Sequence, residues 1–345
     1  MVHATVRDLS RSADLLDLPG AERLAIHKCD VNGPLGHDRL IAEVHPDEFY
    51  NLAGQSSVSE SFRDPSGTWR TNADAVQGML EAVRLHSPAT HFYQASSTEM
   101  FGAVPRRTVV HDEASPFMPQ SPYAAAKAAA HLVCDAYRRA FDLRIACGIL
   151  SNHESHRRPQ GFLTRKVVDY VRRLRDASAV KRDLEPPLAV GNLAARRDWG
   201  FAPDYVEGII RITRQIATRA RTTGTAPEPD VGSSYRDYVL GSGQLHAVWE
   251  LIDRAFALGG IPIDWDRASP DPGRWSARFR STGARAVVVD PSLTRPADPA
   301  AIGTDPSRAR MELGWEAPPS WDRFLVDLLT VTHDVPAARA ADQGR

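Results

Sequence analysis

Residues 90–102 read THFYQASSTEMFG and residues 121–127 read SPYAAAK, and these two stretches decide the fold. The first is an apolar and aromatic run that ends in small hydroxyl-bearing residues, which predicts a strand over residues 90–96. The second opens an alanine-rich segment that predicts a helix over residues 123–141. A strand followed by a long helix is typical of an α/β domain with a parallel sheet.

The same alternation extends in both directions from this pair. We predict further strands at residues 1–7, 24–31, 48–52, 143–150, 188–190 and 286–290. Helices are predicted at residues 38–44, 71–86, 162–175 and 204–220 and near Met311 and Phe324, whereas residues 222–230 and 269–280 are predicted to be irregular. The expected fold is therefore α/β, a Rossmann-like doubly wound parallel sheet with a smaller C-terminal substrate-binding part. We expect a nucleotide-binding domain over residues 1–150, an interleaved substrate-binding part over residues 151–335 and a disordered tail over residues 336–345.

Composition excludes several classes of protein. The 345 residues are 42% hydrophobic and 25% charged, with a formal net charge of -1. This balance argues against a nucleic-acid binder that works by bulk positive charge, and no apolar run reaches the roughly 18 residues of a membrane span. The N-terminus lacks the pattern of a secretion signal, so we expect a cytoplasmic protein. The cysteines Cys29, Cys134 and Cys147 lack metal-ligand spacing and are expected to be reduced, buried thiols.

One unit of a dinucleotide-binding fold is missing from the pattern. Such folds begin with a strand, a glycine-rich turn and a helix whose N-terminus holds the pyrophosphate, yet nothing of this kind precedes the strand at Val2. Two explanations stay open, a start site placed too far downstream or a real loss of the unit. Residues 238–243 (YVLGSG) offer a strand and a GxG turn, but His246 stands where the third glycine belongs. We interpret that segment as a plain strand and turn before a helix over residues 245–257.

Tyr123 and Lys127 carry the clearest chemical signal. Residues four apart lie on one face of a helix, so the ammonium group would favour the phenolate form of the tyrosine and make it a proton acceptor near neutral pH. Lysine is scarce, with four among the 42 basic residues, so a lysine hints at a position that needs an amine. Ser97 follows a predicted strand, where α/β sheets bind ligands, and would hydrogen-bond the same substrate oxygen. Glu99 adds a carboxylate to this site.

Together with longer motifs, these residues resemble the extended short-chain dehydrogenase/reductases, and within them the GDP-mannose 4,6-dehydratase family. The motifs shared with the wider group are residues 49–56 (FYNLAGQS), 94–102 (QASSTEMFG) and 121–127 (SPYAAAK). More specific to this branch are residues 148–158 (GILSNHESHRR) and 191–200 (GNLAARRDWG). Residues 162–166 (FLTRK), 295–296 (RP) and 313–315 (LGW) add to a similarity that covers nearly the whole chain.

The resemblance implies a hydro-lyase that converts GDP-mannose, or a related nucleotide hexose, to the 4-keto-6-deoxy sugar by internal hydride transfer. Tyr123, helped by Ser97 and Lys127, would take the hydroxyl proton at carbon 4 while a hydride passes to NADP. Glu99 would then remove the proton at carbon 5, so that water leaves from carbon 6. Two alternatives stay open: another nucleotide-sugar epimerase, reductase or decarboxylase, and a binding protein that has lost its cofactor site.

By the same resemblance, other residues are expected to bind the cofactor or the substrate. The expected cofactor contacts, with NADP favoured and NAD not excluded, are Arg7, Asp30, Val31, Leu52, Ala53, Gln55, Ser56, Tyr123, Lys127, His153 and Arg158. The expected contacts to the sugar or the diphosphate are Asn152, Lys166, Arg197 and Arg295. Cationic side chains suit phosphate groups. No metal site is expected, and the expected partners are a nucleotide sugar and a second copy in a homodimer.

Some positions depart from the family's pattern. Gly54 and Ser97 are mild changes, whereas Ser57 and Ser151 replace larger residues near the expected sugar. Asp8 stands where the family has a second arginine for the 2′-phosphate of NADP, and a neighbouring loop that braces tetramers is shorter. These departures leave open the identity of the nucleotide sugar, NADP versus NAD, and dimer versus tetramer.

Overall fold

The computed structural model describes residues 1–33, 36–103, 110–177, 185–222, 235–318 and 320–331. The chain divides into two compact units. Unit 1 consists of residues 1–100, 121–149 and 209–238, and unit 2 consists of residues 101–120, 150–208 and 239–345. Each unit is therefore built from segments that are far apart in the sequence. Within the described residues, no helix is both long enough and apolar enough to cross a membrane.

The main sheet has the strand order β3-β4-β6-β11, where β11 is Tyr238–Leu240, and its first three strands belong mainly to unit 1. These are β3 (Glu48–Asn51), β4 (His91–Ser97) and β6 (Ile145–Leu150). β3 and β4 run parallel, with Asn51 opposite Gln94. Most residues of β4 and all residues of β6 are buried, which is typical of strands that are covered on both faces. The α/β class and the parallel pairing predicted from the sequence are confirmed.

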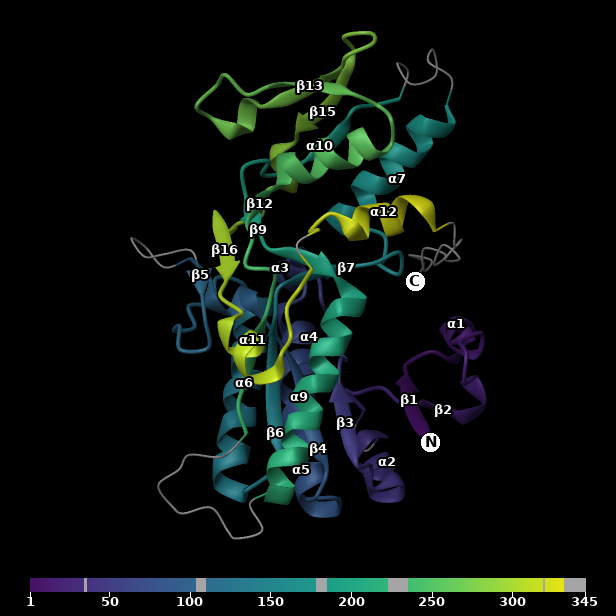
Figure 1. Cartoon of the computed structure of the whole chain (residues 1–345), viewed down its shortest axis with the longest axis vertical. Helices are drawn as coiled ribbons and strands as arrows, with labels where there is room; N and C mark the ends of the chain where they lie inside the picture. Colours follow the sequence, from purple (N-terminus) through teal and green to yellow (C-terminus); the bar gives the residue numbers. More distant parts are fainter. Residues whose placement is uncertain (34–35, 104–109, 178–184, 223–234, 319, 332–345) are drawn as a thin grey trace. The chain divides into compact units, whose positions relative to one another are not determined.

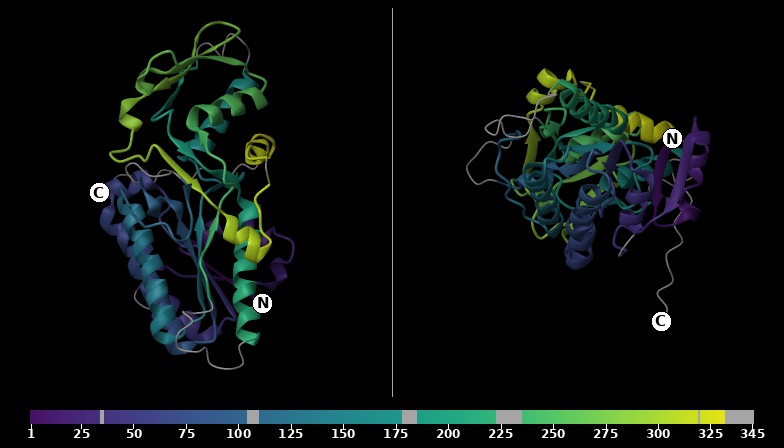
Figure 2. Two further views of the ribbon diagram at one scale, coloured as in Figure 1. Left: turned by 60° about the vertical axis from the view of Figure 1, so that its left-hand side comes forward. Right: turned by 90° about the horizontal axis from the view of Figure 1, so that it is seen from below.

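Helices pack around this sheet. They are α2 (Gly36–Val44), α3 (Val58–Arg63), α4 (Pro65–Trp69), the π-helical turn η3 (Arg70–Asp74), α5 (Ala75–His86) and α6 (Pro122–Phe141). The apolar face of α5, including Val76, Leu80 and Val83, shares one core with Ile145 of β6. α6 packs on β4 and runs along the sheet in Figures 1 and 2. The helix predicted from residue 71 thus begins with a π-helical turn.

The first two strands form a separate sheet, drawn in purple in Figure 1. β1 (Val2–Val6) pairs in parallel with β2 (Leu24–Lys28). The chain between them forms the short turns η1 (Leu9–Arg11), α1 (Ala13–Leu16) and η2 (Ala21–Arg23). β1 and β2 therefore do not join the main sheet of unit 1. The reason is that no strand among the described residues pairs with both β1 and β3, so β3 forms an edge of its sheet.

Unit 2 contains small sheets with the strand orders β12-β9-β16-β5, β13-β14-β15-β8 and β10-β7. Its strands are β5 (Val110–His111), β7 (Asn152–Glu154), β8 (Leu188–Val190), β9 (Arg196–Arg197), β10 (Trp199–Phe201), β12 (His246–Ala247), β13 (Ile263–Asp266), β14 (Ser276–Phe279), β15 (Arg285–Val289) and β16 (Ala301–Thr304). Its helices are α7 (Leu163–Asp176), α10 (Val248–Leu258), α11 (Ser307–Leu313) and α12 (Arg323–Thr330), with the short turns η5 (Pro272–Arg274) and η6 (Pro291–Leu293). Val171, Phe256 and Phe324, from α7, α10 and α12, belong to one buried core.

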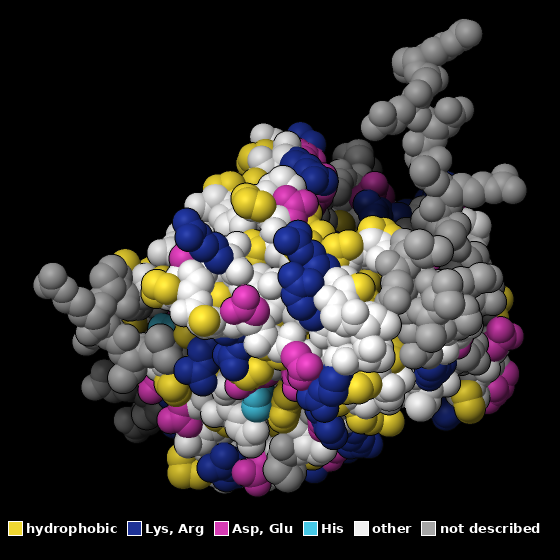
Figure 3. All heavy atoms as spheres, turned by 90° about the horizontal axis from the view of Figure 1, so that it is seen from above, with side chains coloured by type: hydrophobic (Ala, Val, Ile, Leu, Met, Phe, Trp, Pro, Cys, Tyr) yellow, Lys and Arg dark blue, Asp and Glu magenta, His cyan; other side chains and the backbone are white. Residues whose placement is uncertain are grey.

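Four elements have residues in both units: β6, whose last residue Leu150 belongs to unit 2, and three others. The turn η4 (Thr98–Phe101) and the helix α9 (Ala202–Thr222) begin in one unit and end in the other. The strand β11 (Tyr238–Leu240) does the same. On the face drawn in Figure 3, basic, acidic and hydrophobic side chains are interspersed among the described residues.

Two predicted elements differ from the structure. The prediction that residues 269–280 are irregular is wrong for Ser276–Phe279, which pair with β13 and β15 as β14. Only Ala277 and Phe279 of this strand are buried, so its alternating pattern is too short to stand out in the sequence. The helix predicted from residue 245 begins at Val248, because the two preceding residues pair with β9. Residues 223–230 of the predicted loop and the predicted tail lie outside the described residues.

Candidate active site

The carboxyl ends of β3 and β4 lie at one edge of the unit 1 sheet because the two strands run parallel. The side-chain amide of Asn51 donates a hydrogen bond of 2.8 Å to Oε1 of Gln94, which holds the two strands in register near this edge. β3 leads directly into Leu52, and β4 leads into Thr98. In α/β sheets this edge is where ligands bind.

α6 presents Tyr123 and Lys127 from its first turns. The helix begins after Ser121, whose Oγ accepts a hydrogen bond of 3.1 Å from the backbone N–H of Ala124. Tyr123 and Lys127 are both buried, one helical turn apart. Nζ of Lys127 donates a hydrogen bond of 3.0 Å to the backbone carbonyl of Ala95 in β4. Burial lowers the pKa of Lys127 to about 8, so its charge is easily removed compared with an exposed lysine.

Ser97 and Glu99 lie immediately beyond Ala95. Oγ of Ser97, the last residue of β4, accepts a hydrogen bond of 3.3 Å from the backbone N–H of Glu99. Glu99 lies in the turn η4 and is half-buried. All four predicted catalytic residues belong to unit 1, on the end of β4 and the start of the helix that packs on it. A hydroxyl, a carboxylate, a phenol and an amine in this arrangement can serve proton transfer.

Asn72 is part of this site although the sequence analysis did not select it. It lies in the π-helical turn η3 and is buried. Its Oδ1 accepts from the backbone N–H of Gln55, and its Nδ2 donates to the backbone carbonyl of Gln55, both at 2.8 Å. A methyl group placed on Gly54 would lie 2.9 Å from Oδ1 of Asn72 and 3.5 Å from Nζ of Lys127. Its neighbours Arg70, Thr71 and Asp74 are also polar, so the sequence pattern does not single it out.

The predicted cofactor residues of unit 1 follow its parallel strands. Arg7 follows β1, and Asp30 and Val31 follow β2. Oδ1 of Asp30 accepts a hydrogen bond of 3.0 Å from the backbone N–H of Asn32. The segment after β3 contains Leu52, Ala53, Gln55 and Ser56. This placement at carboxyl strand ends suits the nucleotide that the sequence predicts.

The segment after β3 also fits the nicotinamide end of such a cofactor. Leu52 is 62% exposed and presents an apolar side chain directly after β3. Ala53 and Gly54 carry little or no side chain, so a planar ring can approach the backbone closely. Lys127 lies beside Gly54 with its amine buried, where it can donate to a ribose hydroxyl.

His153 and Arg158, the other predicted cofactor residues, belong to unit 2. Nδ1 of His153 lies 2.8 Å from the carbonyl oxygen of Ser151, and its ring stacks on Tyr205. Burial lowers the pKa of His153, which favours the neutral ring. The guanidinium of Arg158 binds both carboxylate oxygens of Glu154. Both side chains are therefore held by protein groups.

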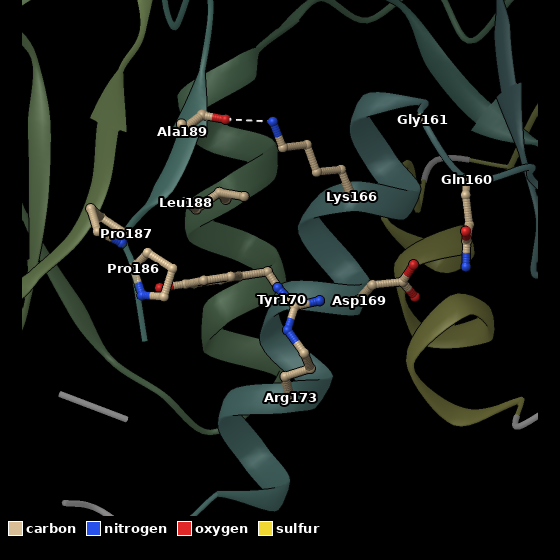
Figure 4. Close-up of a pocket in the computed structure, with 10 residues that line it drawn as sticks. All are labelled: Gln160, Gly161, Lys166, Asp169, Tyr170, Arg173, Pro186, Pro187, Leu188 and Ala189. Atoms are coloured by element: carbon tan, nitrogen blue, oxygen red, sulfur yellow. Dashed lines mark hydrogen bonds between the residues drawn. The ribbon is translucent and has the colours of Figure 1, made fainter. Parts of the chain in front are cut away.

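Lys166 lines a cavity of about 490 Å³ in unit 2, shown in Figure 4. Its Nζ donates a hydrogen bond of 2.7 Å to the carbonyl oxygen of Ala189. The wall combines the ring of Tyr170 with Pro186, Leu188 and other apolar groups, and Arg173 adds a second cation, while Asp169 adds a carboxylate. An apolar wall with two cations can bind a ligand that has an aromatic ring and an attached anionic group.

The other predicted substrate residues lie elsewhere in unit 2. Asn152 is half-buried in β7. Arg197 is buried, and its guanidinium donates hydrogen bonds of 2.7 Å to Asp298 and 2.8 Å to the carbonyl oxygen of Pro299. Arg295 lies 3.7 Å from the same Asp298. These contacts occupy donors of Arg197 that the sequence analysis assigned to a phosphate, and the assignment of these residues to substrate stays a prediction.

The GxG turn between β11 and β12 is filled by a carboxylate of the chain itself. The backbone N–H groups of Ser242 and Gly243 each donate a hydrogen bond of 2.9 Å to Asp198. The hydroxyls of Ser242, Thr304 and Ser151 donate to the same carboxylate, which is buried. The turn therefore binds an internal anion, which agrees with the interpretation that it is not a phosphate loop.

Known sequences identify the family. The chain matches the family described as GDP-mannose 4,6 dehydratase over residues 2–327. It is 36% identical over 299 residues to the GDP-mannose 4,6-dehydratase of Vibrio cholerae serotype O1, with 84% of this chain and 74% of that protein covered. It is 35% identical over 306 residues to GDP-mannose 4,6 dehydratase 2 of Arabidopsis thaliana, with 88% of this chain and 70% of that protein covered.

Solved structures of lower identity share the fold. RMD from Pseudomonas aeruginosa, complexed with NADPH, has a TM-score of 0.68 at 21% identity and covers 95% of this chain and 98% of its own. The dTDP-glucose 4,6-dehydratase DesIV from Streptomyces venezuelae, with NAD bound, has a TM-score of 0.67 at 22% identity and covers 92% of this chain and 81% of its own. The family match spans nearly the whole chain, and the relatives exceed 30% identity over most of it. The chain therefore belongs to the GDP-mannose 4,6-dehydratase family.

Proposed function

We propose that this chain is a hydro-lyase that converts GDP-mannose to its 4-keto-6-deoxy derivative with a nicotinamide cofactor, and that NADP is preferred over NAD. One observation carries the proposal. In a chain of this family, Ser97 ends β4 and Glu99 lies in the turn that follows, while Tyr123 and Lys127 lie at the start of the helix that packs on β4. A simple dehydrogenase needs one acid–base group, whereas loss of water needs a second proton transfer at the adjacent carbon.

Each side chain has one task in this proposal. The phenolate of Tyr123 takes the proton of the carbon 4 hydroxyl, and Ser97 donates a hydrogen bond to the same oxygen. Lys127 favours the phenolate by its charge. When bound, the nicotinamide supplies the hydride acceptor at carbon 4 and returns the hydride to carbon 6. The ketone at carbon 4 acidifies the proton on carbon 5, which Glu99 removes and then delivers to the hydroxyl that leaves carbon 6 as water. When the hydride reaches carbon 6, carbon 5 takes up the proton that Tyr123 received from the carbon 4 hydroxyl, so that both Tyr123 and Glu99 end in their starting protonation states.

The unit 2 cavity is proposed to hold the nucleotide part of the substrate. Its volume of about 490 Å³ is in the range of small-molecule sites, which run from roughly 300 to 1,000 Å³. Lys166 uses one of its three N–H groups on Ala189, so two remain for phosphate oxygens. Arg173 lies over the ring of Tyr170 and adds positive charge to the wall. Asn152, Arg197 and Arg295 are proposed to act on the sugar or the diphosphate.

The test is the mass of the product formed from GDP-mannose and a catalytic amount of NADP. We expect the loss of one water without net consumption of cofactor. Tyr123→Phe should lower kcat by about 10² to 10⁴. Tyr137→Phe is the matched control, because Tyr137 lies on the same helix but bonds Glu81. An unchanged product mass with GDP-mannose would refute the proposed reaction.

A second candidate is another nucleotide-sugar enzyme, favoured by Ser57 and Ser151, which are small where the family carries larger residues. The same assay with UDP- and dTDP-hexoses, and with NAD in place of NADP, decides between them. If thermal shift detects binding of neither cofactor, the catalytic proposal fails and a binding role replaces it. The proposal includes a homodimer in the cytoplasm, which light scattering and cell fractionation test.

A further inference from the structure

The face of α6 that carries Tyr123 and Lys127 continues beyond the proposed site. His131 lies one turn after Lys127, at the same i, i+4 spacing, and Arg138 lies two turns further on. Both side chains are buried, with His131 7% exposed and Arg138 4% exposed. Buried ionisable groups are rare unless they have partners, so the partners of this pair identify their task.

His131 binds the strand that ends in the proposed catalytic serine. Its Nδ1 lies 3.0 Å from Oγ of Ser96, and both groups are buried. Ser96 lies between Ala95, whose carbonyl accepts from Lys127, and Ser97. Two consecutive residues of β4 are therefore bonded to two consecutive turns of α6, directly before Ser97.

The far side of the imidazole faces a buried ion pair. Nε2 of His131 lies 3.5 Å from Oδ2 of Asp237. Oδ1 of Asp237 accepts hydrogen bonds of 2.7 Å from Arg138 and 2.8 Å from the backbone N–H of Cys147 in β6. Burial opposes the charged form of His131, but Cys147 and Asp237 outweigh it, so its pKa is raised above the usual value. The imidazole is thus held between β4 and a fixed carboxylate.

A metal ion is the competing explanation for this cluster. His131, Cys147 and Asp237 offer ligand atoms that all lie within 4.8 Å of one another. Arg138, however, already supplies a cation to Asp237 at 2.7 Å. Burial also raises the pKa of the Cys147 thiol well above its usual value, whereas a metal needs the thiolate. Arg138 therefore already balances the negative charge of Asp237, and the cluster does not need a metal ion for this purpose.

We propose that His131 is a positioning residue for the dehydration: through Ser96 it fixes the end of β4 against α6, and so holds Ser97 and Lys127 in line with Tyr123. The inference rests on the proposed function. Ser97 and Tyr123 must meet one substrate oxygen although they come from different elements, and a displacement of about 1 Å in such a site can cost about 10² in rate.

Two isosteric variants separate this role from simple packing. The amide of His131→Asn lies near the former Nδ1 and can still bond Ser96, whereas the amide of His131→Gln lies near the former Nε2 and keeps only the contact to Asp237. We expect His131→Gln and Ser96→Ala each to lower kcat about tenfold or more with little change in KM. His131→Asn should stay within about threefold of the parent, and Ser96→Ala with His131→Gln should be no worse than either alone. Equal losses in Asn and Gln variants would overturn the proposal.

A second measurement needs no substrate or cofactor. The chain has four lysines, so ¹³C-labelled lysine gives few NMR signals, and the signal of Lys127 is the one that is missing from Lys127→Met and is expected to titrate near pH 8. If His131 positions β4, the Lys127 pKa should rise in His131→Gln and Ser96→Ala, because a displaced amine is less buried and burial is what lowers its pKa, and it should stay in place in His131→Asn. An unmoved Lys127 titration in all three folded variants would overturn the proposal. Failure of the parent to dehydrate GDP-mannose, with the titration behaving as expected, would refute the proposed function alone.

Discussion

Nζ of Lys127 lies 3.0 Å from the carbonyl oxygen of Ala95, and this hydrogen bond joins the second turn of α6 to the end of β4. The amine is buried, and its pKa is lowered to about 8. The contact places the amine next to the predicted catalytic serine, and the burial of the amine brings the loss of its charge close to neutral pH.

We expect kcat of the proposed reaction to fall as the pH rises above about 8. Below that pH Lys127 is charged and favours the phenolate of Tyr123, and above it the charge is lost. The free energy of unfolding should change in the opposite direction. Between about pH 8 and the usual lysine pKa, the amine of Lys127 is protonated in the unfolded chain but not in the folded one, so its contribution to the free energy of unfolding rises with pH. A pH series of kcat with the parent and Lys127→Met checks this. A parent profile with no alkaline limb would contradict it.

Glu99→Gln should separate the two proton transfers. Oxidation at carbon 4 needs Tyr123 and should continue, whereas removal of the carbon 5 proton should slow by about 10² to 10⁴. Stopped-flow absorbance should then show reduced nicotinamide after GDP-mannose is added, with little water lost. Glu81→Gln is the control, because Glu81 pairs with Arg84 on the surface of α5. Dehydration at the parental rate in Glu99→Gln would rule out this role.

Gly54→Ala should disturb the site through Asn72. The added methyl would lie 2.9 Å from Oδ1 of Asn72, which is held by two hydrogen bonds to Gln55 and cannot easily move. We expect a loss of about 1 to 3 kcal/mol in the free energy of unfolding, measured with urea. In an Asn72→Ala background the same change should cost much less. Additive losses in this double-mutant cycle would show that the two residues do not interact.

Asp198→Ala should destabilise unit 2 strongly. It leaves the N–H groups of Ser242 and Gly243 and the hydroxyl of Thr304 without their acceptor in a buried place. We expect a loss of about 3 kcal/mol or more, since each unsatisfied buried group costs about 1 to 3 kcal/mol. Asp271→Ala should cost about 1 kcal/mol, because Asp271 caps an exposed turn. Similar losses from both variants would contradict the role of Asp198 as the centre of the turn.

Local features of the site could be predicted from the sequence. Tyr123 and Lys127 share a face because any helix places residues four apart together, and Ser97 ends its strand because the apolar run stops there. Contacts over long separations could not be predicted. Asp198 fills a turn 44 residues later in the chain, and Arg197 binds an aspartate 101 residues later. A GxG turn and an arginine both suit an anion, but the sequence does not say whether the anion is a ligand or a side chain.

The order of the strands could not be predicted either, because hydrophobic alternation identifies strands but not their neighbours. Each of β1 and β3 has a clear strand pattern, and the pattern is the same whether or not another strand pairs with both. The π-helical turn at Arg70–Asp74 is similar, since one extra residue in a turn leaves the spacing of Val76, Leu80 and Val83 unchanged.

Because β1 and β2, among the described strands, pair only with each other, this two-stranded sheet can unfold locally without disturbing the main sheet. Breaking that pair removes no ladder hydrogen bond from β3, β4 or β6, and most of its side chains are only half-buried or exposed. A two-stranded sheet is marginally stable by itself. Amide hydrogens of β1 and β2 should therefore exchange with solvent through a local opening, while the hydrogen bond between Lys127 and Ala95 stays intact. The β1–β2 sheet, with the predicted cofactor residues that follow its strands, and the proton-transfer residues on β4 and α6 would then unfold as separate cooperative units.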